Sequence, residues 1–168
     1  NAGNQISDVI QKSLNYVDKV IVCDDGSTDN TFKNAKLAGA FVLKHEKNLG
    51  KGAALKTLFK KAKELNADIV ITIDGDGQFL PKEMVRLIEP IQNNNFDLVI
   101  GNRFLDKREM PTYRKAGNKI LDSFTKLAAN LPFDDTQSGF RSYSKTAIEK
   151  ISFSTNGFGV DSEILIDA

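Results

Sequence analysis

Cysteine, net charge and long apolar runs are all scarce in this 168-residue sequence. The one cysteine, Cys23, lies within an apolar run and has no second cysteine with which to form an internal disulfide, which fits a reducing compartment. The 23 Lys and Arg residues nearly balance the 22 Asp and Glu residues, and a net charge of +1 indicates neither a nucleic-acid-binding surface nor an acidic tail. No apolar stretch reaches the roughly 18 residues of a membrane-spanning helix, and no signal peptide opens the sequence.

What the sequence does contain is a regular alternation of two patterns. Short apolar runs at 19–24, 40–45, 68–74 and 96–102 are typical of buried strands, and segments with helical periodicity separate them. Strands separated by helices imply parallel crossover connections, so the pattern predicts a doubly wound α/β domain with a mostly parallel central sheet and helices on both faces. No linker or low-complexity segment divides the chain, and residues 1–168 are predicted to form one domain.

Polar side chains follow three of the four predicted strands. They are Asp24 and Asp25, then Asp74 and Asp76, then Asn102 and Arg103. One Asp after a strand is most often a turn or cap residue. Three such sets at corresponding places indicate more, because ligands of open α/β sheets bind outside the carboxyl ends of the strands.

Three kinds of chemistry use two carboxylates spaced as in DGDGQ (74–78). A calcium-binding EF-hand loop starting at Asp74 would need a sharply turning residue, normally Gly, at its sixth position and a bidentate Glu at its twelfth, where this chain has Phe79 and Val85. A phosphatase of the haloacid dehalogenase type attacks phosphorus with the first Asp of such a pair. Its usual Thr is replaced by Gln78, but FDDT at 133–136 resembles its distal acidic pair, so this alternative stays open.

The third chemistry is a clamp for a metal diphosphate. Hard carboxylate oxygens hold Mg²⁺ or Mn²⁺ and leave positions open for phosphate oxygens. Gly75 and Gly77 suit this role, because a bulky ligand can approach a backbone that carries no side chain.

Five motifs occur in order along the chain: VIVCDDGSTDNT, NLGKGAAL, IVITIDGDGQ, GNRF and DTQSGFRSYS. Their order and approximate spacing resemble those of family 2 glycosyltransferases with the GT-A fold, and most closely the dolichyl- or polyprenyl-phosphate mannose and glucose synthases. The resemblance covers nearly the whole chain. It implies an inverting hexosyltransferase that moves mannose or glucose from a GDP- or UDP-sugar to polyprenyl or dolichyl phosphate. A family 2 enzyme with a saccharide acceptor is the alternative within the family.

The resemblance also implies roles for particular residues. The expected nucleotide-sugar-binding residues are Asp24, Asp25, Asn48, Gly50, Lys51, Gly52 and Asp74, with Asp25 on the base. A divalent cofactor, Mg²⁺ or Mn²⁺, is expected on Asp74, Asp76 and Gln78. The expected catalytic residues are Asp76, Arg103 and Arg141, since a planar guanidinium can grip two phosphate oxygens. The expected acceptor residues are Arg103, Arg114, Gln137, Ser138 and Arg141.

The remaining expectations concern the ends of the sequence, the membrane and the one histidine. The family's first strand is expected to be missing before NAGNQ, and FGVDSEILIDA ends within a predicted helix, where Asp161 and Glu163 resemble a family acidic pair. The basic segment 101–131 is expected either to receive a lipid phosphate at the cytoplasmic face of a membrane or to be a plain loop leading to a core helix. His45 lies outside the motifs and is expected to have a structural or surface role.

Overall fold

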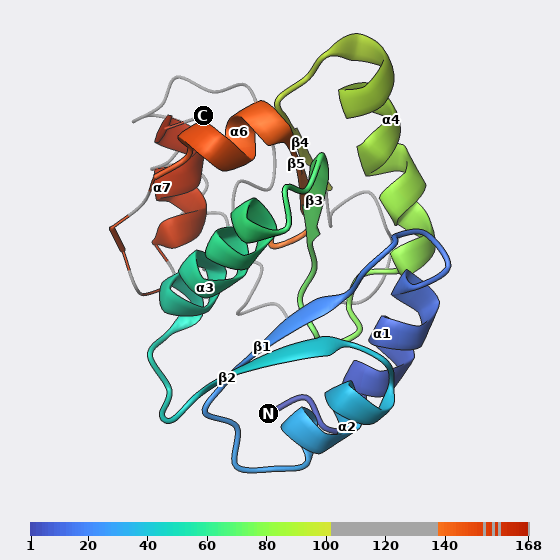
Figure 1. The fold of residues 1–168 in the computed structure, drawn as a ribbon, viewed down its shortest axis with the longest axis vertical. Coiled ribbons are helices and arrows are strands. Elements are labelled where there is room, and N and C mark those ends of the chain that lie inside the picture. The colour runs from blue at the N-terminus through green and yellow to red at the C-terminus, as the bar shows by residue number, and fades with distance from the viewer. Residues whose placement is uncertain (102–137, 153, 156, 158, 168) are drawn as a thin grey trace, which may run out of the picture.

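The computed structural model shows an α/β fold with helices on both sides of its strands (Figure 1). It describes residues 1–101, 138–152, 154, 155, 157 and 159–167. Strands β1 (Ile21–Asp25) and β2 (Phe41–His45) form a parallel pair. Strands β3 (Ile69–Thr72) and β4 (Leu98–Ile100) each pair with β5 (Arg141–Ser144), which lies between them.

The four predicted strands are confirmed as β1 to β4, but β5 was not predicted and changes the sheet. It runs antiparallel to both β3 and β4, so the three-stranded part is not parallel as expected. Its sequence, RSYS, has no apolar run that marks a strand. The pairing of β5 with two apolar strands therefore decides its conformation, and local propensity does not.

Most helices lie where helical segments were predicted, and α6 is the one in the following set that was not predicted. The described helices are α1 (Ile6–Ser13), α2 (Thr31–Leu37), α3 (Lys51–Glu64), the 3₁₀ turn η1 (Pro81–Glu83), α4 (Met84–Asn94), α6 (Lys145–Lys150) and α7 (Val160–Asp167). Gly39, just after α2, has a φ of +99°, as expected for a glycine that ends a helix. Pro81 opens η1, where its missing N–H costs nothing. Within the described ranges, no helix is both long and apolar enough to cross a membrane.

Alternation along the strands sends side chains to two different helix layers. Val70 of β3 and Tyr143 of β5 pack with buried residues of α3, α6 and α7. Ile71 of β3 and Val99 of β4 face the other way and pack with Met84 and Leu87 of α4. In a strand, residues two apart share a face. Thr72 and Arg141 therefore lie on the α3, α6 and α7 side, at the end of the sheet that carries the acidic turn.

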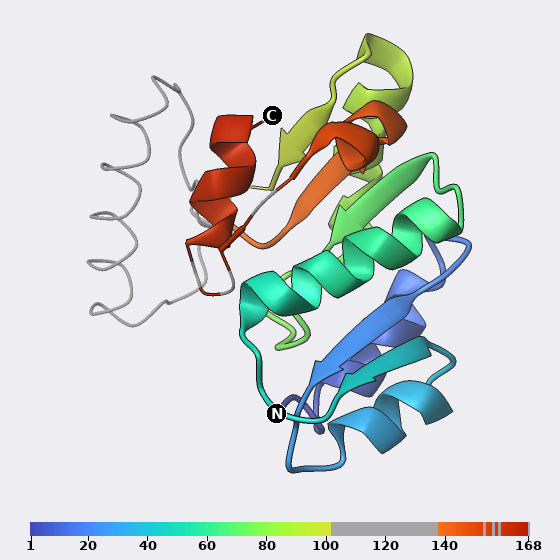
Figure 2. The same ribbon diagram turned by 60° about the vertical axis from the view of Figure 1, so that its left-hand side comes forward.

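Helix α3 connects the two groups of strands. It contacts β1 on one side and α6 on the other, and both views show it crossing between them (Figures 1 and 2). The opposite side of the β1–β2 pair packs against α1 and α2 through small and β-branched side chains. The N-terminus of α3 thus lies where β1, β2 and β3 end, and its first residue is Lys51.

Candidate functional site

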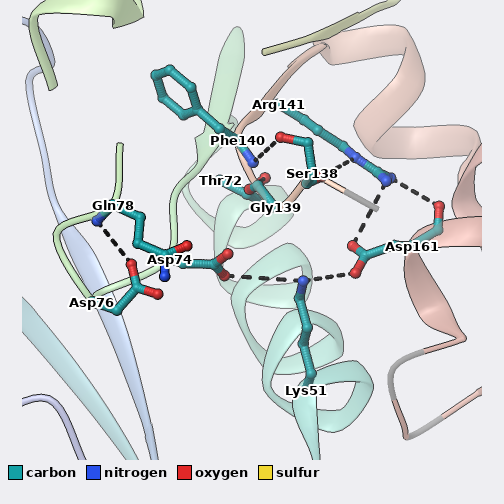
Figure 3. A network of polar contacts seen from close by, with 10 residues as sticks. All are labelled: Lys51, Thr72, Asp74, Asp76, Gln78, Ser138, Gly139, Phe140, Arg141 and Asp161. Carbon is teal, nitrogen blue, oxygen red and sulfur yellow. Dashed lines mark hydrogen bonds and ion pairs between the residues drawn. The ribbon is translucent and has the colours of Figure 1, made fainter. Parts of the chain in front are cut away.

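The acidic turn follows β3 directly. Asp74 lies two residues beyond the strand, and its side chain is 41% exposed. Asp76 is exposed, and its Oδ1 accepts a hydrogen bond of 3.0 Å from the backbone N–H of Gln78 (Figure 3). Gly77 between them has a φ of +73°, a backbone conformation that favours glycine. The turn therefore presents two carboxylates and an amide side chain from one short segment.

The segment just before β5 lies against this turn. The Thr72 hydroxyl donates a hydrogen bond of 2.9 Å to the Gly139 carbonyl. A Cβ atom at Gly139 would come within 2.5 and 2.7 Å of the two Asp74 carboxylate oxygens. The motifs at 70–78 and 138–144 are thus in contact, and only glycine at position 139 leaves room for the Asp74 carboxylate where it stands.

Lys51 joins the turn to the C-terminal helix. Its Nζ lies 2.7 Å from Asp161 Oδ2, in the first turn of α7, and 3.9 Å from Asp74 Oδ1 (Figure 3). The Lys51 side chain is 22% exposed, so it is no ordinary surface lysine at a helix start. An ammonium held between two carboxylates balances part of their charge.

Arg141 completes what we call the ion-pair network, which consists of Lys51, Asp74, Arg141 and Asp161. Its guanidinium is fully buried, and Nε donates to the Ser138 carbonyl at 2.8 Å while Nη1 donates to the Asp161 carbonyl at 3.0 Å. Nη2 lies 3.7 Å from Asp161 Oδ1. Burial raises the pKa of Asp161, and the attraction of Lys51 and Arg141 opposes that rise.

A second polar group lies at the ends of β1 and β2. Asp25 Oδ1 is 2.7 Å from His45 Nδ1 and accepts from the Leu49 N–H at 2.9 Å, while Oδ2 accepts from the Gly50 N–H at 2.8 Å. Burial alone would raise the pKa of Asp25. The hydrogen bonds from the two amides and His45 outweigh burial and lower it, because they favour the ionised carboxylate.

Asp24, one residue earlier, has the opposite environment. It is only 2% exposed, and its Oδ1 accepts one hydrogen bond of 3.3 Å from the Ser27 N–H. Its Oδ2 is buried and has no hydrogen-bond partner among the described residues. A buried acceptor without a donor costs free energy unless a ligand or water supplies one.

The structure brings together part of the predicted site. Lys51, Asp74 and Arg141 share one network, and Asp76 and Gln78 belong to the adjoining turn. Arg141, expected to bind phosphate, instead directs its guanidinium to protein groups, and Ser138 is fully buried beside it. Several predicted residues lie outside the described residues: Asn102, Arg103, Arg114, Gln137, the 133–136 acidic pair and nearly all of the 101–131 segment.

Two contributors were not predicted as site residues. Asp161 was noted only as part of an acidic pair, and its contact with Lys51 spans 110 positions of sequence, which no local pattern reveals. Gly139 lies in the DTQSGFRSYS motif, but its role depends on the close approach of the Asp74 carboxylate, which the sequence does not reveal. Glu163, the other acid of the pair, instead binds the backbone of Ser154 and Thr155.

The described residues form an α/β fold in which charged side chains lie at or just beyond the carboxyl ends of β1, β2 and β3, the edge where open α/β sheets commonly bind ligands. The model of the family described as Glycosyl transferase family 2 matches residues 1–152, and the chain belongs to that family. This membership favours the metal-diphosphate clamp over the phosphatase alternative for the paired aspartates.

Individual relatives and solved structures agree with this family membership. The UDP-N-acetylglucosamine–dolichyl-phosphate N-acetylglucosaminyltransferase of Methanococcus voltae is 36% identical over 90% of this chain and 69% of its own length. The dolichol-phosphate mannosyltransferase of Pyrococcus furiosus is 31% identical over 97% of this chain and 47% of its own length. Glucosyl-3-phosphoglycerate synthase of Mycobacterium tuberculosis, solved with Mn²⁺, UDP-glucose and phosphoglyceric acid, superposes with a TM-score of 0.75 at 26% identity.

The chain spans only part of these proteins. The structural match covers 99% of this chain but 61% of the mycobacterial enzyme. The GT-A-type α/β fold expected from the sequence is confirmed by that match. Among the described residues, the strands form two sheets instead of one, and β5 is antiparallel to both of its neighbours.

Proposed function

We propose that this domain transfers a sugar from a nucleoside-diphosphate sugar to a polyprenyl or dolichyl phosphate. The observation that carries the proposal is the set of contacts at the end of β3, where Asp74 meets Lys51 beside the exposed Asp76. Family membership supplies the class of reaction, and the M. voltae and P. furiosus relatives, both named for dolichyl or dolichol phosphate, favour a lipid-phosphate acceptor.

The donor atoms of the acidic turn fit a divalent cation. Asp74, Asp76 and Gln78 offer hard oxygen ligands of the kind that Mg²⁺ and Mn²⁺ prefer. Across the part of the chain that the structure describes, no cluster of three or more His, Cys, Asp or Glu residues suits a metal. A site with so few protein ligands suits a metal that also binds diphosphate oxygens. Once bound, the cation would stabilise negative charge on the departing nucleoside diphosphate.

The nucleotide base is assigned to Asp24 here, in place of Asp25. Both Asp25 oxygens already accept hydrogen bonds from the protein, whereas Asp24 Oδ2 has none from the described residues. A base N–H would satisfy that buried oxygen. Asn48, Gly50, Lys51 and Gly52 then line the donor between Asp24 and the acidic turn, as the resemblance implies.

The reaction is a single displacement with inversion. An oxygen of the acceptor phosphate forms a bond to the anomeric carbon while the bond from that carbon to the diphosphate oxygen breaks, and the nucleoside diphosphate leaves with the electron pair. A phosphate acceptor is already ionised near neutral pH, so no side chain has to remove a proton. Lys51 balances part of the negative charge of Asp74 and Asp161 and holds the end of β3 close to α7. A lipid acceptor would also bring the domain to a membrane face.

The test is a panel of donors and acceptors with the purified chain. UDP-glucose, UDP-N-acetylglucosamine, GDP-mannose and ADP-glucose are each added with Mn²⁺, with Mg²⁺ or with EDTA, and the melting temperature is measured. A donor at a hundred times its dissociation constant stabilises the fold by about 2.7 kcal/mol. We expect metal-dependent stabilisation by UDP- or GDP-sugars.

Transfer of labelled sugar is then measured to polyprenyl phosphate in vesicles, to phosphoglyceric acid and to a soluble saccharide. We expect label in the lipid phosphate. Label only in the saccharide, or only in phosphoglyceric acid, would contradict the lipid acceptor. A phosphorylated Asp74 would contradict glycosyl transfer itself.

A further inference from the structure

His45 links three elements near the donor side of the site. It is the last residue of β2, and its side chain is 13% exposed. Nδ1 lies 2.7 Å from Asp25 Oδ1, at the end of β1, and Nε2 lies 2.9 Å from the Thr57 hydroxyl of α3. A carboxylate oxygen only accepts hydrogen bonds, so Nδ1 carries a proton, and the Thr57 hydroxyl is free to donate to Nε2. We call Asp25, His45 and Thr57 the bracket.

The bracket holds the segment that leads into α3. Asp25 accepts the backbone N–H groups of Leu49 and Gly50, so its carboxylate is shared between His45 and this segment. Next to it, Gly26 packs against the same segment so closely that a Cβ there would come within 2.5 Å of the Asn48 nitrogen. Residues 47–50 are therefore attached to the end of β1 by two separate contacts, and Lys51 follows directly.

We propose that His45 is a positioning residue for donor binding: through Asp25 and Thr57 it holds residues 48–51 in the arrangement that binds the nucleotide sugar. This inference rests on the proposed function. Gly50 has a φ of +97° and forms no side-chain cap, so the segment depends on partners outside itself to keep its shape. If the bracket is broken, only a fraction of molecules has the segment in place, and the apparent dissociation constant rises by the inverse of that fraction.

A nucleophilic role for the neighbouring thiol is the other chemistry that this cluster suggests. Cys23 Sγ lies 3.6 Å from His45 Nε2, which in turn pairs with Asp25, in the order of a Cys-His-Asp triad. Burial, with a contribution from Asp25 and Asp24, raises the pKa of Cys23 to about 11. The thiol therefore stays protonated at neutral pH and is a poor nucleophile. Its contact with Nε2, at 3.6 Å, is longer and weaker than the 2.9 Å contact of the Thr57 hydroxyl, which makes Cys23→Ala a matched control.

The test compares His45→Leu, His45→Asn and Cys23→Ala with the parent. Hydrogen exchange of the Leu49 and Gly50 amides reports whether the segment stays attached. Titration with UDP-glucose and with GDP-mannose, each with Mn²⁺, gives the donor dissociation constant, and transfer at saturating donor gives kcat. In His45→Leu, we expect the two amides to exchange at least about tenfold faster and the dissociation constant to rise about fivefold to tenfold, with kcat within about twofold.

Asn places an amide N–H near the position of Nδ1–H, so His45→Asn should recover most of the affinity, and Cys23→Ala should behave as the parent. Parent-like exchange and affinity in His45→Leu would overturn the proposal, as would an equal loss in Cys23→Ala. If His45→Leu does not fold, Thr57→Val removes only the hydroxyl and should shift both measurements in the same direction by about twofold; no shift there counts against the proposal. If the parent binds none of the four donors of the panel described above, the proposed function fails, and the exchange rates alone decide whether His45 holds the segment.

Discussion

The β1–β2 end of the site and the β3–β5 end are held together in different ways. At the first, the hydrogen bonds of Asp25 join residues at most 25 positions apart, and two of the donors are backbone amides. At the second, the ion pair between Lys51 and Asp161 joins residues 110 positions apart. The contacts of the first end lie within residues 25–57, whereas those of the second join α3, β5 and α7.

Two aspartates show the consequence for charge. The pKa of Asp25 is lowered because three hydrogen bonds to the carboxylate outweigh its burial, while burial raises the pKa of Asp161 in spite of two nearby cations. At the β1–β2 end, hydrogen bonds from backbone amides thus stabilise the ionised form of Asp25. At the β3–β5 end, the positive charges of Lys51 and Arg141 only partly offset the burial of Asp161, so we expect that end to be more sensitive to substitution.

The largest expected effect comes from Asp161→Ala, which breaks the ion-pair network. It leaves the buried guanidinium of Arg141 without its carboxylate, and removing one partner of a buried pair costs about 3–5 kcal/mol. Urea unfolding measures the loss. Asp8→Ala removes a surface pair, with Lys12, and should cost at most about 1 kcal/mol. Equal losses in the two variants would show that the network is no stronger than a surface pair.

Asp76→Asn should abolish most of the transfer without unfolding the protein. The side chain is exposed and its shape is kept, but a charged ligand is lost where the diphosphate charge develops. Transfer should fall at least about 100-fold. The melting temperature without ligand should stay near that of the parent. Activity within a few-fold of the parent would contradict a metal clamp at the β3 end.

Gly139→Ala should act on the same end through geometry. The new Cβ would displace the Asp74 carboxylate, which can rotate away at small cost to the fold. Misplacing a reacting group by about 1 Å costs up to about 100-fold, so we expect transfer to fall about tenfold or more. Gly157→Ala is the control, because no atom of the described residues lies within 4 Å of a Cβ at that position. If both variants keep full activity, the position of Asp74 is not critical.

Asp24→Asn should weaken donor binding more than it slows turnover. The buried Oδ2 is assigned to a base N–H, a contact present in ground and transition states alike. We expect the donor dissociation constant to rise about tenfold while transfer at saturating donor changes little. A collapse of turnover with unchanged affinity would place Asp24 at the reacting centre.

The smallest expected effect is a change in how the stability of the protein depends on acid pH, through Asp25 at the β1–β2 end. Because the pKa of Asp25 is lower in the folded protein than the ordinary value of 3.8, its ionised form stabilises the fold above that value. This stabilisation is lost as the pH falls through the folded pKa. Asp25→Asn should therefore be less stable than the parent at pH 6, and the difference should shrink by pH 3. A constant difference in urea unfolding across this range would contradict the assignment.

Much of the fold was predictable because its signals are local. The runs at 19–24, 40–45, 68–74 and 96–102 each became a strand, and Gly39 and Pro81 stand at helix boundaries as their backbone chemistry requires. β5 was missed because RSYS is polar, and its strand conformation comes from neighbours distant in sequence.

The candidate site, too, has one part that the local sequence predicted and another that it did not. The sequence alone determined which strands end in acids, because apolar runs and the residues that follow them are adjacent along the chain. Only the tertiary structure decided which partner each charge takes. Asp25 joins His45, Arg141 turns inward to Asp161, and one Asp24 oxygen is left without a hydrogen-bond partner among the residues that the structure describes. Hydrogen bonds and ion pairs form over a few ångströms in space, and separation along the chain does not specify those distances.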